Sequence, residues 1–305
     1  MWHRRLRFRN VENVLDEIDG LKRNFGIKYL VFNDDNMTIN REFTMKLCQG
    51  MIDRKFNIKW SVSGGLYVPS LDEKLVDMMI KSGFNIFTLA IESGSQEILD
   101  SIRKKVRLSE IAEKVNMLRK FDAYIEGYFM LGFPEETEKQ LKMTIDFSAG
   151  LDLDWRCYQC VQPYPGTDLY DECVKKKLID EEAMEDFEIF DRRNYIIKPV
   201  HFSQDYVLRE SYIANLRYNF LNNKNLNGSG SNVRRAITDF RWVLNMVPDH
   251  IVAAHCLALA YDRVGDKKDA DLYRNKVRML AKDAGIRRKY YLDELGINKY
   301  EEALN

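Results

Sequence analysis

Short apolar runs that end in small or acidic residues recur along the first half of the chain at nearly constant spacing. The runs end near residues 35, 64, 93, 132 and 163, so successive ends are 29, 29, 39 and 31 residues apart. A strand, a crossover helix and two short loops together need roughly 30 residues. The spacing therefore predicts a repeated strand–helix unit, which builds a parallel sheet with helices outside it.

The expected elements follow from the apolar period and from the residues that interrupt it. Strands are expected over 27–32, 58–62, 85–91, 124–131 and 156–162. Helices are expected over 11–25, 41–54, 72–81, 96–120 and 137–148. The continuous apolar run at 27–32 is typical of a strand buried on both faces. Five strands preceded by a helix favour a partial parallel barrel over a complete eight-stranded one.

Composition narrows the classes of protein to which the chain can belong. It has 305 residues, 45% of them hydrophobic, which is enough to bury a sizeable core and excludes wholesale disorder. Lys and Arg together number 47, as do Asp and Glu, and this balance argues against a nucleic-acid partner. Five widely spaced cysteines favour a reducing compartment over a disulfide framework. We expect a cytoplasmic protein without a membrane span.

Chemically distinctive residues gather where the expected strands end, which is the edge where parallel α/β proteins bind ligands. Asp34 and Asp35 follow the first strand and could hold a cation or an ammonium group, or could simply form a turn. Glu92 follows the third strand and could accept hydrogen bonds from ribose hydroxyls, while Ser95 is expected to cap the next helix. Gly132 follows the fourth strand, and its missing side chain could admit a flat ligand.

Other motifs carry weaker signals. Residues 132–137 are expected to begin a helix with a proline and an acidic first turn. Cys157 and Cys160 form a CxxC, but residues three apart in a strand point to opposite faces, which argues against a metal or redox pair. His255 and Cys256 are expected to lie in a helical core. The commonest hydrolase, P-loop and dinucleotide-binding motifs are absent from the sequence.

The C-terminal region keeps helical periodicity throughout. Ala236 and Ala270 lie 34 residues apart, which is the period of the tetratricopeptide repeat. Eleven positions match that repeat: Ala236, Phe240, Val243, Pro248, Ala254, Leu257, Ala258, Tyr261, Gly265, Asp266 and Ala270. Residues 228–231 are typical of a flexible linker, and 171–227 are expected to be mostly helical.

The order of motifs resembles that of the radical S-adenosylmethionine (SAM) enzymes, and within them the cobalamin-associated subgroup. The similar segments are Arg7 and Arg9 with Val11–Ile18, Phe32–Asn36, Trp60, Lys81–Gly83, Ile91–Gly94 with Ile98 and Leu99, Met130–Thr137, and Pro163–Thr167. Each segment alone is a weak signal, and the ordered series is specific. The resemblance covers residues 7–170 and implies a partial (β/α)6 barrel that here lacks its first strand.

The resemblance also implies cofactors and residue roles. Asp34 and Asp35 would bind the methionine amino group of SAM, and Glu92 with Ser93 would contact its ribose and carboxylate. The strand that ends at Leu131–Gly132 would flank the adenine. The family also holds a [4Fe–4S] cluster and, in this subgroup, cobalamin. No residue of this chain is assigned as a metal ligand.

The family's cluster loop, CxxxCxxC, precedes the helix that corresponds to residues 11–25, and residues 1–10 contain no cysteine. We therefore expect the chain to be the core and C-terminal part of a radical SAM enzyme, a fragment rather than a degenerate paralogue, and to be inactive alone. The resemblance implies methyl transfer, ring closure or hydrogen abstraction on an unknown small or lipid-like substrate. The expected segments are a cluster-loop remnant (1–10), the barrel (11–170), a helical extension (171–227) and tetratricopeptide-like repeats (232–305).

Two further interpretations stay open at this point. In the first, the chain is a non-catalytic scaffold whose tetratricopeptide-like tail binds a protein partner. In the second, it is a different barrel enzyme that holds a divalent cation with Asp34, Asp35 and Glu92.

Overall fold

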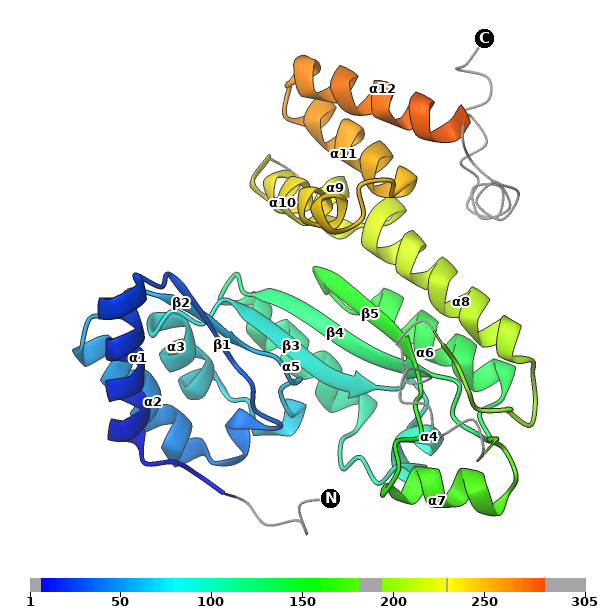
Figure 1. The fold of residues 1–305 in the computed structure, drawn as a ribbon, viewed down its shortest axis with the longest axis horizontal. Coiled ribbons are helices and arrows are strands. Elements are labelled where there is room, and N and C mark those ends of the chain that lie inside the picture. Colours follow the sequence, from blue (N-terminus) through cyan, green and yellow to red (C-terminus); the bar gives the residue numbers. More distant parts are fainter. Residues whose placement is uncertain (1–6, 181–193, 229, 283–305) are drawn as a thin grey trace. The chain divides into compact units, whose positions relative to one another are not determined.

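The chain folds into two units, shown in Figure 1. The structure is a computed structural model that describes residues 7–180, 194–228 and 230–282. Unit 1 comprises the chain up to Leu153 together with Cys157–Leu208, and unit 2 comprises Asp154–Arg156 and the chain from Arg209 onward. The expectations for residues 1–6 and 283–305 lie outside the described residues.

Five strands lie close to their expected positions. They are β1 (Tyr29–Phe32), β2 (Lys59–Val62), β3 (Ile86–Glu92), β4 (Tyr124–Leu131) and β5 (Trp155–Cys160). β1 pairs with β2 in parallel, β3 pairs with β4 in parallel, and β5 is hydrogen-bonded to β4. Parallel bridges from Trp60 to Phe84 and from Leu66 to Leu89 join β2 to β3. The strands therefore lie in chain order, as a repeated strand–helix unit produces.

Helices separate the strands, as the apolar period predicts. They are α1 (Val11–Phe25), α2 (Arg41–Asp53), α3 (Glu73–Lys81), α4 (Gln96–Ser101), α5 (Leu108–Arg119), α6 (Glu138–Gly150) and α7 (Asp168–Lys175). Asn10 caps α1 through its side chain, and Gly26 ends that helix at a φ of 62°. The single helix expected over 96–120 was wrong. Arg103 adopts a φ of 58° in the loop that separates α4 from α5.

The first strand departs from its expected burial. Tyr29 and Val31 expose 43% and 52% of their surface, so β1 is not buried on both faces. Among the described residues β1 pairs with β2 alone, and it forms one edge of the sheet. The apolar run predicted the strand correctly but not its burial. Whether a strand lies inside a sheet or at its edge depends on the strands beside it, which the run itself does not encode.

The sheet has one face covered by helices. Along β4, buried residues (Ile125, Gly127, Phe129, Leu131) alternate with half-buried ones (Glu126, Tyr128, Met130). Phe129 stacks on Tyr158 of β5, whose hydroxyl bonds Ser148 of α6, so the buried set faces the helices. We call the opposite face, which carries Thr88, Glu126 and Cys157, the open face of the sheet.

Helices dominate the rest of the chain. They are α8 (Gln204–Leu216), a π-helical turn (Arg217–Leu221), α9 (Lys224–Asn227), α10 (Gly230–Met246), α11 (Ile251–Arg263) and α12 (Lys267–Lys282). Ala236, Phe240, Ala254 and Ala270 are fully buried where α10, α11 and α12 pack together. The helices are confirmed, and their identity as tetratricopeptide repeats stays a prediction. Residues 171–227 were expected to be mostly helical. Residues 181–193 lie outside the described residues, and most of the rest is helical, with 194–200 as a non-helical segment.

Candidate functional site at the carboxyl edge of the sheet

The carboxyl ends of neighbouring strands meet along one continuous edge. A Cβ placed on Gly64, just after β2, would lie 2.6 Å from the carbonyl oxygen of Asp34. A Cβ on Gly65 would lie 2.7 Å from the Cβ of Ala90 in β3. The two glycines therefore allow the backbone after β2 to approach both neighbours closely. As a result the residues after β1 and those near Glu92 belong to the same edge.

The two aspartates after β1 form an exposed turn. Asp34 Oδ1 accepts a hydrogen bond from the backbone N–H of Asn36 at 2.8 Å, which is the turn geometry that aspartate favours. Asp35 is also exposed. Both carboxylates can reach solvent at the strand edge, so the turn and a role in ligand binding are compatible. That role stays a prediction.

Glu92 ends β3 in an unusual backbone conformation. Its φ is 73°, and the register with β4 is irregular between Ala90 and Glu92. Such a conformation costs a non-glycine residue on the order of 1–3 kcal/mol and often occurs at functional sites. Glu92 Oε1 lies 2.9 Å from the Nζ of Lys104, and the side chains are only 24% and 20% exposed. The edge thus holds a carboxylate and an ammonium side by side.

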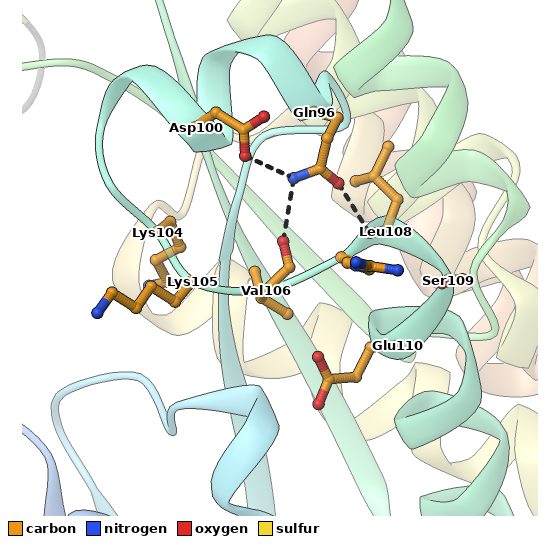
Figure 2. A pocket seen from close by; sticks show the side chains of 9 residues that line it. Gln96, Asp100, Lys104, Lys105, Val106, Leu108, Ser109 and Glu110 are labelled. Atoms are coloured by element: carbon orange, nitrogen blue, oxygen red, sulfur yellow. Dashed lines mark hydrogen bonds between the residues drawn. The ribbon is translucent and has the colours of Figure 1, made fainter.

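Sequence reasoning missed Lys104, although the basic run at 103–105 was a visible signal. Lys104 also lines a cavity of about 670 Å³ beside the loop between α4 and α5 (Figure 2). In that cavity Gln96 Nε2 donates to Asp100 Oδ1 at 3.0 Å and to the Val106 carbonyl at 3.1 Å. The loop that replaces the expected continuous helix is held in place by these bonds, and it positions Lys104 against Glu92.

Ser93 is fully buried, and its hydroxyl is engaged within the protein. Its Oγ lies 3.0 Å from Thr144 Oγ1 on α6 and accepts a bond from the backbone N–H of Ser95 at 3.0 Å. Ser95 is the N-cap residue of α4, as predicted, but its side chain makes no capping hydrogen bond. Ser93 anchors the turn after β3, and its proposed contact with a ligand stays a prediction.

An aromatic ring lies against Gly132, and it comes from the chain itself. Gly132 has a φ of 87°, and a Cβ there would lie 2.8 Å from Cζ of Tyr195. The Tyr195 hydroxyl donates to the Gly132 carbonyl at 2.7 Å. Burial raises the pKa of Tyr195, so this hydroxyl stays protonated and can keep donating. A ring of the protein itself therefore fills the space left by the missing side chain, and the predicted contact of Gly132 with a flat ligand stays a prediction.

Glu136 is a buried carboxyl group that sequence reasoning did not single out. Its Oε2 accepts the backbone N–H groups of Gly132 at 2.6 Å and Phe133 at 3.3 Å, while Oε1 has no partner. Burial raises its pKa to about 7, although the two backbone bonds oppose this. The expected proline-started helix was wrong, because α6 begins at Glu138 with Thr137 as its cap.

The described residues do not fit a [4Fe–4S] cluster. Cys48, Cys160, Cys173 and Cys256 are buried, Cys157 is half-buried, and none is in a disulfide. Burial raises the pKa of the Cys48 and Cys173 thiols to about 11, which disfavours the thiolate form that binds iron. Within the parts of the chain that the structure describes, no group of three His, Cys, Asp or Glu side chains could hold a metal.

The two cysteines of the CxxC lie on opposite faces of β5. Along β5, half-buried and buried residues alternate, which places Cys157 and Cys160 on opposite faces as predicted. Cys256 is fully buried in the helical core, as predicted, whereas His255 is half-buried, and burial lowers its pKa to about 4. The divalent-cation interpretation is not supported, since Glu92 pairs with Lys104.

Comparison with known proteins agrees with the fold. Residues 1–148 match the family profile described as the Radical SAM superfamily. An uncharacterized methyltransferase of Pyrococcus horikoshii is 29% identical over 214 residues, which cover 69% of this chain and 46% of that protein. An anaerobic magnesium-protoporphyrin IX monomethyl ester cyclase of Cereibacter sphaeroides is 27% identical over 63% of this chain and 31% of that protein.

A solved structure shows the same fold at low sequence identity. It is the radical SAM methyltransferase TsrM of Kitasatospora setae with tryptophan and a SAM analogue bound, and it matches with a TM-score of 0.50 and 16% identity. The match covers 55% of this chain and 33% of that one. The chain spans less than half the length of these relatives. No helix in the described ranges is long and apolar enough to cross a membrane. The α/β part of this chain is therefore similar to the radical SAM superfamily over residues 1–148.

Proposed function

We propose that the chain is the core and C-terminal part of a radical SAM enzyme that binds SAM at the carboxyl edge of the sheet. The observation that supports this best is the Glu92–Lys104 pair, 2.9 Å apart at the end of β3, in a domain that matches the radical SAM profile. The methionine end of SAM carries one ammonium and one carboxylate. An edge with acidic and basic side chains is complementary to that end.

Each part of SAM has a candidate partner on this edge. Asp34 and Asp35 would bind the ammonium group, and Lys104 would bind the carboxylate. Glu92 would accept the ribose hydroxyls, with Ser93 beside it. The end of β4 at Leu131 and Gly132 would flank the adenine, with Tyr195 beside it.

The cluster, the cobalamin and the type of reaction are the next parts of the proposal. The cysteines described here do not fit the cluster, so we propose that these residues are inactive alone and that cluster and cobalamin are held by protein outside them. The relatives are named as methyltransferases and as a cyclase, which supports methyl transfer or ring closure on a small-molecule substrate. We further propose a cytoplasmic location, because the five cysteines form no disulfide. We propose no nucleic-acid partner, because Lys plus Arg and Asp plus Glu are equal in number.

A SAM titration followed by amide NMR tests the site. We expect weak binding that shifts residues after β1, β3 and β4, since no cluster chelates the methionine end. Lys104→Ala should weaken SAM binding about tenfold, because it removes one charge-assisted hydrogen bond that contributes about 1.4 kcal/mol. Lys120→Ala, which removes an exposed lysine paired with Glu73, is the matched control.

Three outcomes would contradict this proposal. They are the absence of any shift at the strand edge, equal loss in both lysine variants, and tight binding without iron. A stable iron–sulfur cluster after anaerobic reconstitution with iron and sulfide would also contradict the assignment of the cluster to protein outside these residues.

A non-catalytic scaffold is the second candidate function. Trp242 and Met246, one helical turn apart on α10, expose 63% and 68% of their surface. Exposed apolar side chains of this size often mark surfaces that bind a protein partner. If SAM shifts no resonance at the strand edge, the scaffold becomes the better explanation of the chain.

A further inference from the structure

Three polar side chains from neighbouring strands meet on the open face of the sheet. Thr88 of β3 and Glu126 of β4 lie opposite each other in register, and Thr88 Oγ1 donates to Glu126 Oε2 at 2.9 Å. The thiol of Cys157 on β5 donates to Glu126 Oε1 at 3.3 Å. The carboxylate therefore receives one hydrogen bond on each oxygen, and both donors are uncharged.

The charge of Glu126 is not balanced within the part of the chain that is described. None of the ion pairs there includes Glu126, whereas the half-buried Glu92 has Lys104. Desolvation raises the pKa of Glu126, and the bonds from Cys157 and Thr88 only partly oppose it. A cation bound beside this half-buried carboxylate would stabilise its charged form, because burying an uncompensated charge costs free energy. Each oxygen can accept one more hydrogen bond.

The open face gives a ligand a route from this carboxylate to the strand edge. Thr88 and Ala90 of β3 pair in register with Glu126 and Tyr128 of β4 on the open face, and Glu92 follows at the irregular end of the strand. Four residues of strand span about 13 Å, a length suited to a small molecule. Tyr128 and Met130 of β4 flank the same route with half-buried apolar surface.

We propose that Glu126, together with Thr88 and Cys157, binds a cationic nitrogen group of the substrate, a primary ammonium or a guanidinium. The nitrogen supplies N–H donors to the free lone pairs of the carboxylate, and the apolar part of the molecule lies against Tyr128 and Met130 toward the edge. That the bound molecule is a substrate rests on the proposed function. The preference for a cation rests on Glu126 alone.

Cys157 provides a direct probe of the local charge, because it is the one cysteine of the five that is not buried. The full-length chain is treated with 2-aminoethyl methanethiosulfonate or with the anionic 2-sulfonatoethyl reagent. Each forms a mixed disulfide with the Cys157 sulfur, releases methanesulfinate and leaves the thiol proton in solvent. Peptide mass spectrometry measures both rates, each normalised to the reaction of the same reagent with 2-mercaptoethanol.

The cationic reagent should label Cys157 at least about tenfold faster, which corresponds to ~1.4 kcal/mol of charge interaction at this range. Glu126→Gln keeps the shape of the side chain and should abolish the preference. Thr88→Val removes a hydroxyl but no charge, so it should retain the preference. Glu138→Gln, which removes an exposed carboxylate at the start of α6, controls for net charge.

Equal labelling by the two reagents, or a preference that survives Glu126→Gln, would overturn the proposal. If Glu126→Gln fails to fold, the proposal is tested on the unsubstituted chain, by measuring how far an added amine protects Cys157 from labelling. n-Butylammonium should slow labelling by neutral methyl methanethiosulfonate more than n-butanol does, and equal slowing rejects the site. None of these measurements needs SAM or iron. Loss of SAM binding with the charge preference intact would reject the proposed function and leave this site standing.

Discussion

Single side chains in unit 1 decide how the carboxyl edge of the sheet is shaped. Gly132 has a backbone conformation that favours glycine, and the ring of Tyr195 fills the space where a side chain would stand. Glu136 accepts the N–H of the same glycine at 2.6 Å. One residue therefore has its carbonyl bound by a phenol and its amide bound by a carboxyl group. The turn after β4 is held from both sides, and its geometry depends on the protonation state of Glu136.

The buried carboxyl group of Glu136 makes stability depend on pH. Its pKa is about 7 in the folded chain against 4.5 for an ordinary glutamate, so the folded state favours the protonated form. The stabilisation is complete below pH ~4.5 and is lost as the pH rises through 7, by about 3 kcal/mol in all. Chemical denaturation at pH 5 and pH 8 measures the loss.

Glu136→Gln is the matched variant, because its amide oxygen can still accept from Gly132 and it does not titrate. The unfolding free energy of the variant should change less between the two pH values than that of the unchanged chain. Parallel pH profiles for the two proteins would show that Glu136 is not the group responsible.

On the scale of the helices, Thr137 and Ser95 occupy the same N-cap position before α6 and α4, but only the Thr137 side chain forms a capping hydrogen bond. Thr137 and Gln140 form a complete capping box at the start of α6. Ser95 stands at the corresponding position of α4, but its hydroxyl is buried and has no partner. The difference arises because the Ser95 N–H is bound to Ser93, which fixes the turn before the helix begins.

Substitution of the two capping positions should therefore have unequal effects. Thr137→Ala should lower the unfolding free energy by about 1 kcal/mol, because it leaves a helix amide without its acceptor. Ser95→Ala should be neutral or slightly stabilising, since it removes a buried hydroxyl that has no partner. Urea denaturation of both variants measures the difference, and equal losses would contradict it.

On the scale of the whole molecule, the chain combines a parallel α/β unit with a second unit whose described part from Arg209 onward is helical. The helical unit has its own core, in which Phe240 is fully buried and stacks on Phe220 with ring centroids 5.4 Å apart. The core of unit 1 is built from strands and helices of the sheet, with Trp60 and Phe129 fully buried. Two separate cores predict that each unit can lose stability by itself.

Phe240→Ala tests this separation. Truncation of a fully buried phenylalanine costs about 3–5 kcal/mol, so the variant should lose amide-exchange protection throughout α10, α11 and α12. Hydrogen exchange followed by mass spectrometry should show unchanged protection in β3 and β4. Loss of protection spread evenly over both units would mean that they unfold as one.

The sequence by itself determined the order of strands and helices, because hydrophobic period, turn residues and helix-ending glycines act over a few neighbouring residues. It also predicted that Asp34, Glu92 and Gly132 lie at the ends of the first, third and fourth strands, and that Cys157 and Cys160 face opposite sides. The contacts made by these residues were decided by the tertiary structure. Tyr195 lies 63 residues from Gly132, Thr144 51 from Ser93, and Cys157 31 from Glu126. No local pattern can encode such pairs, since they exist only once the strands and helices pack.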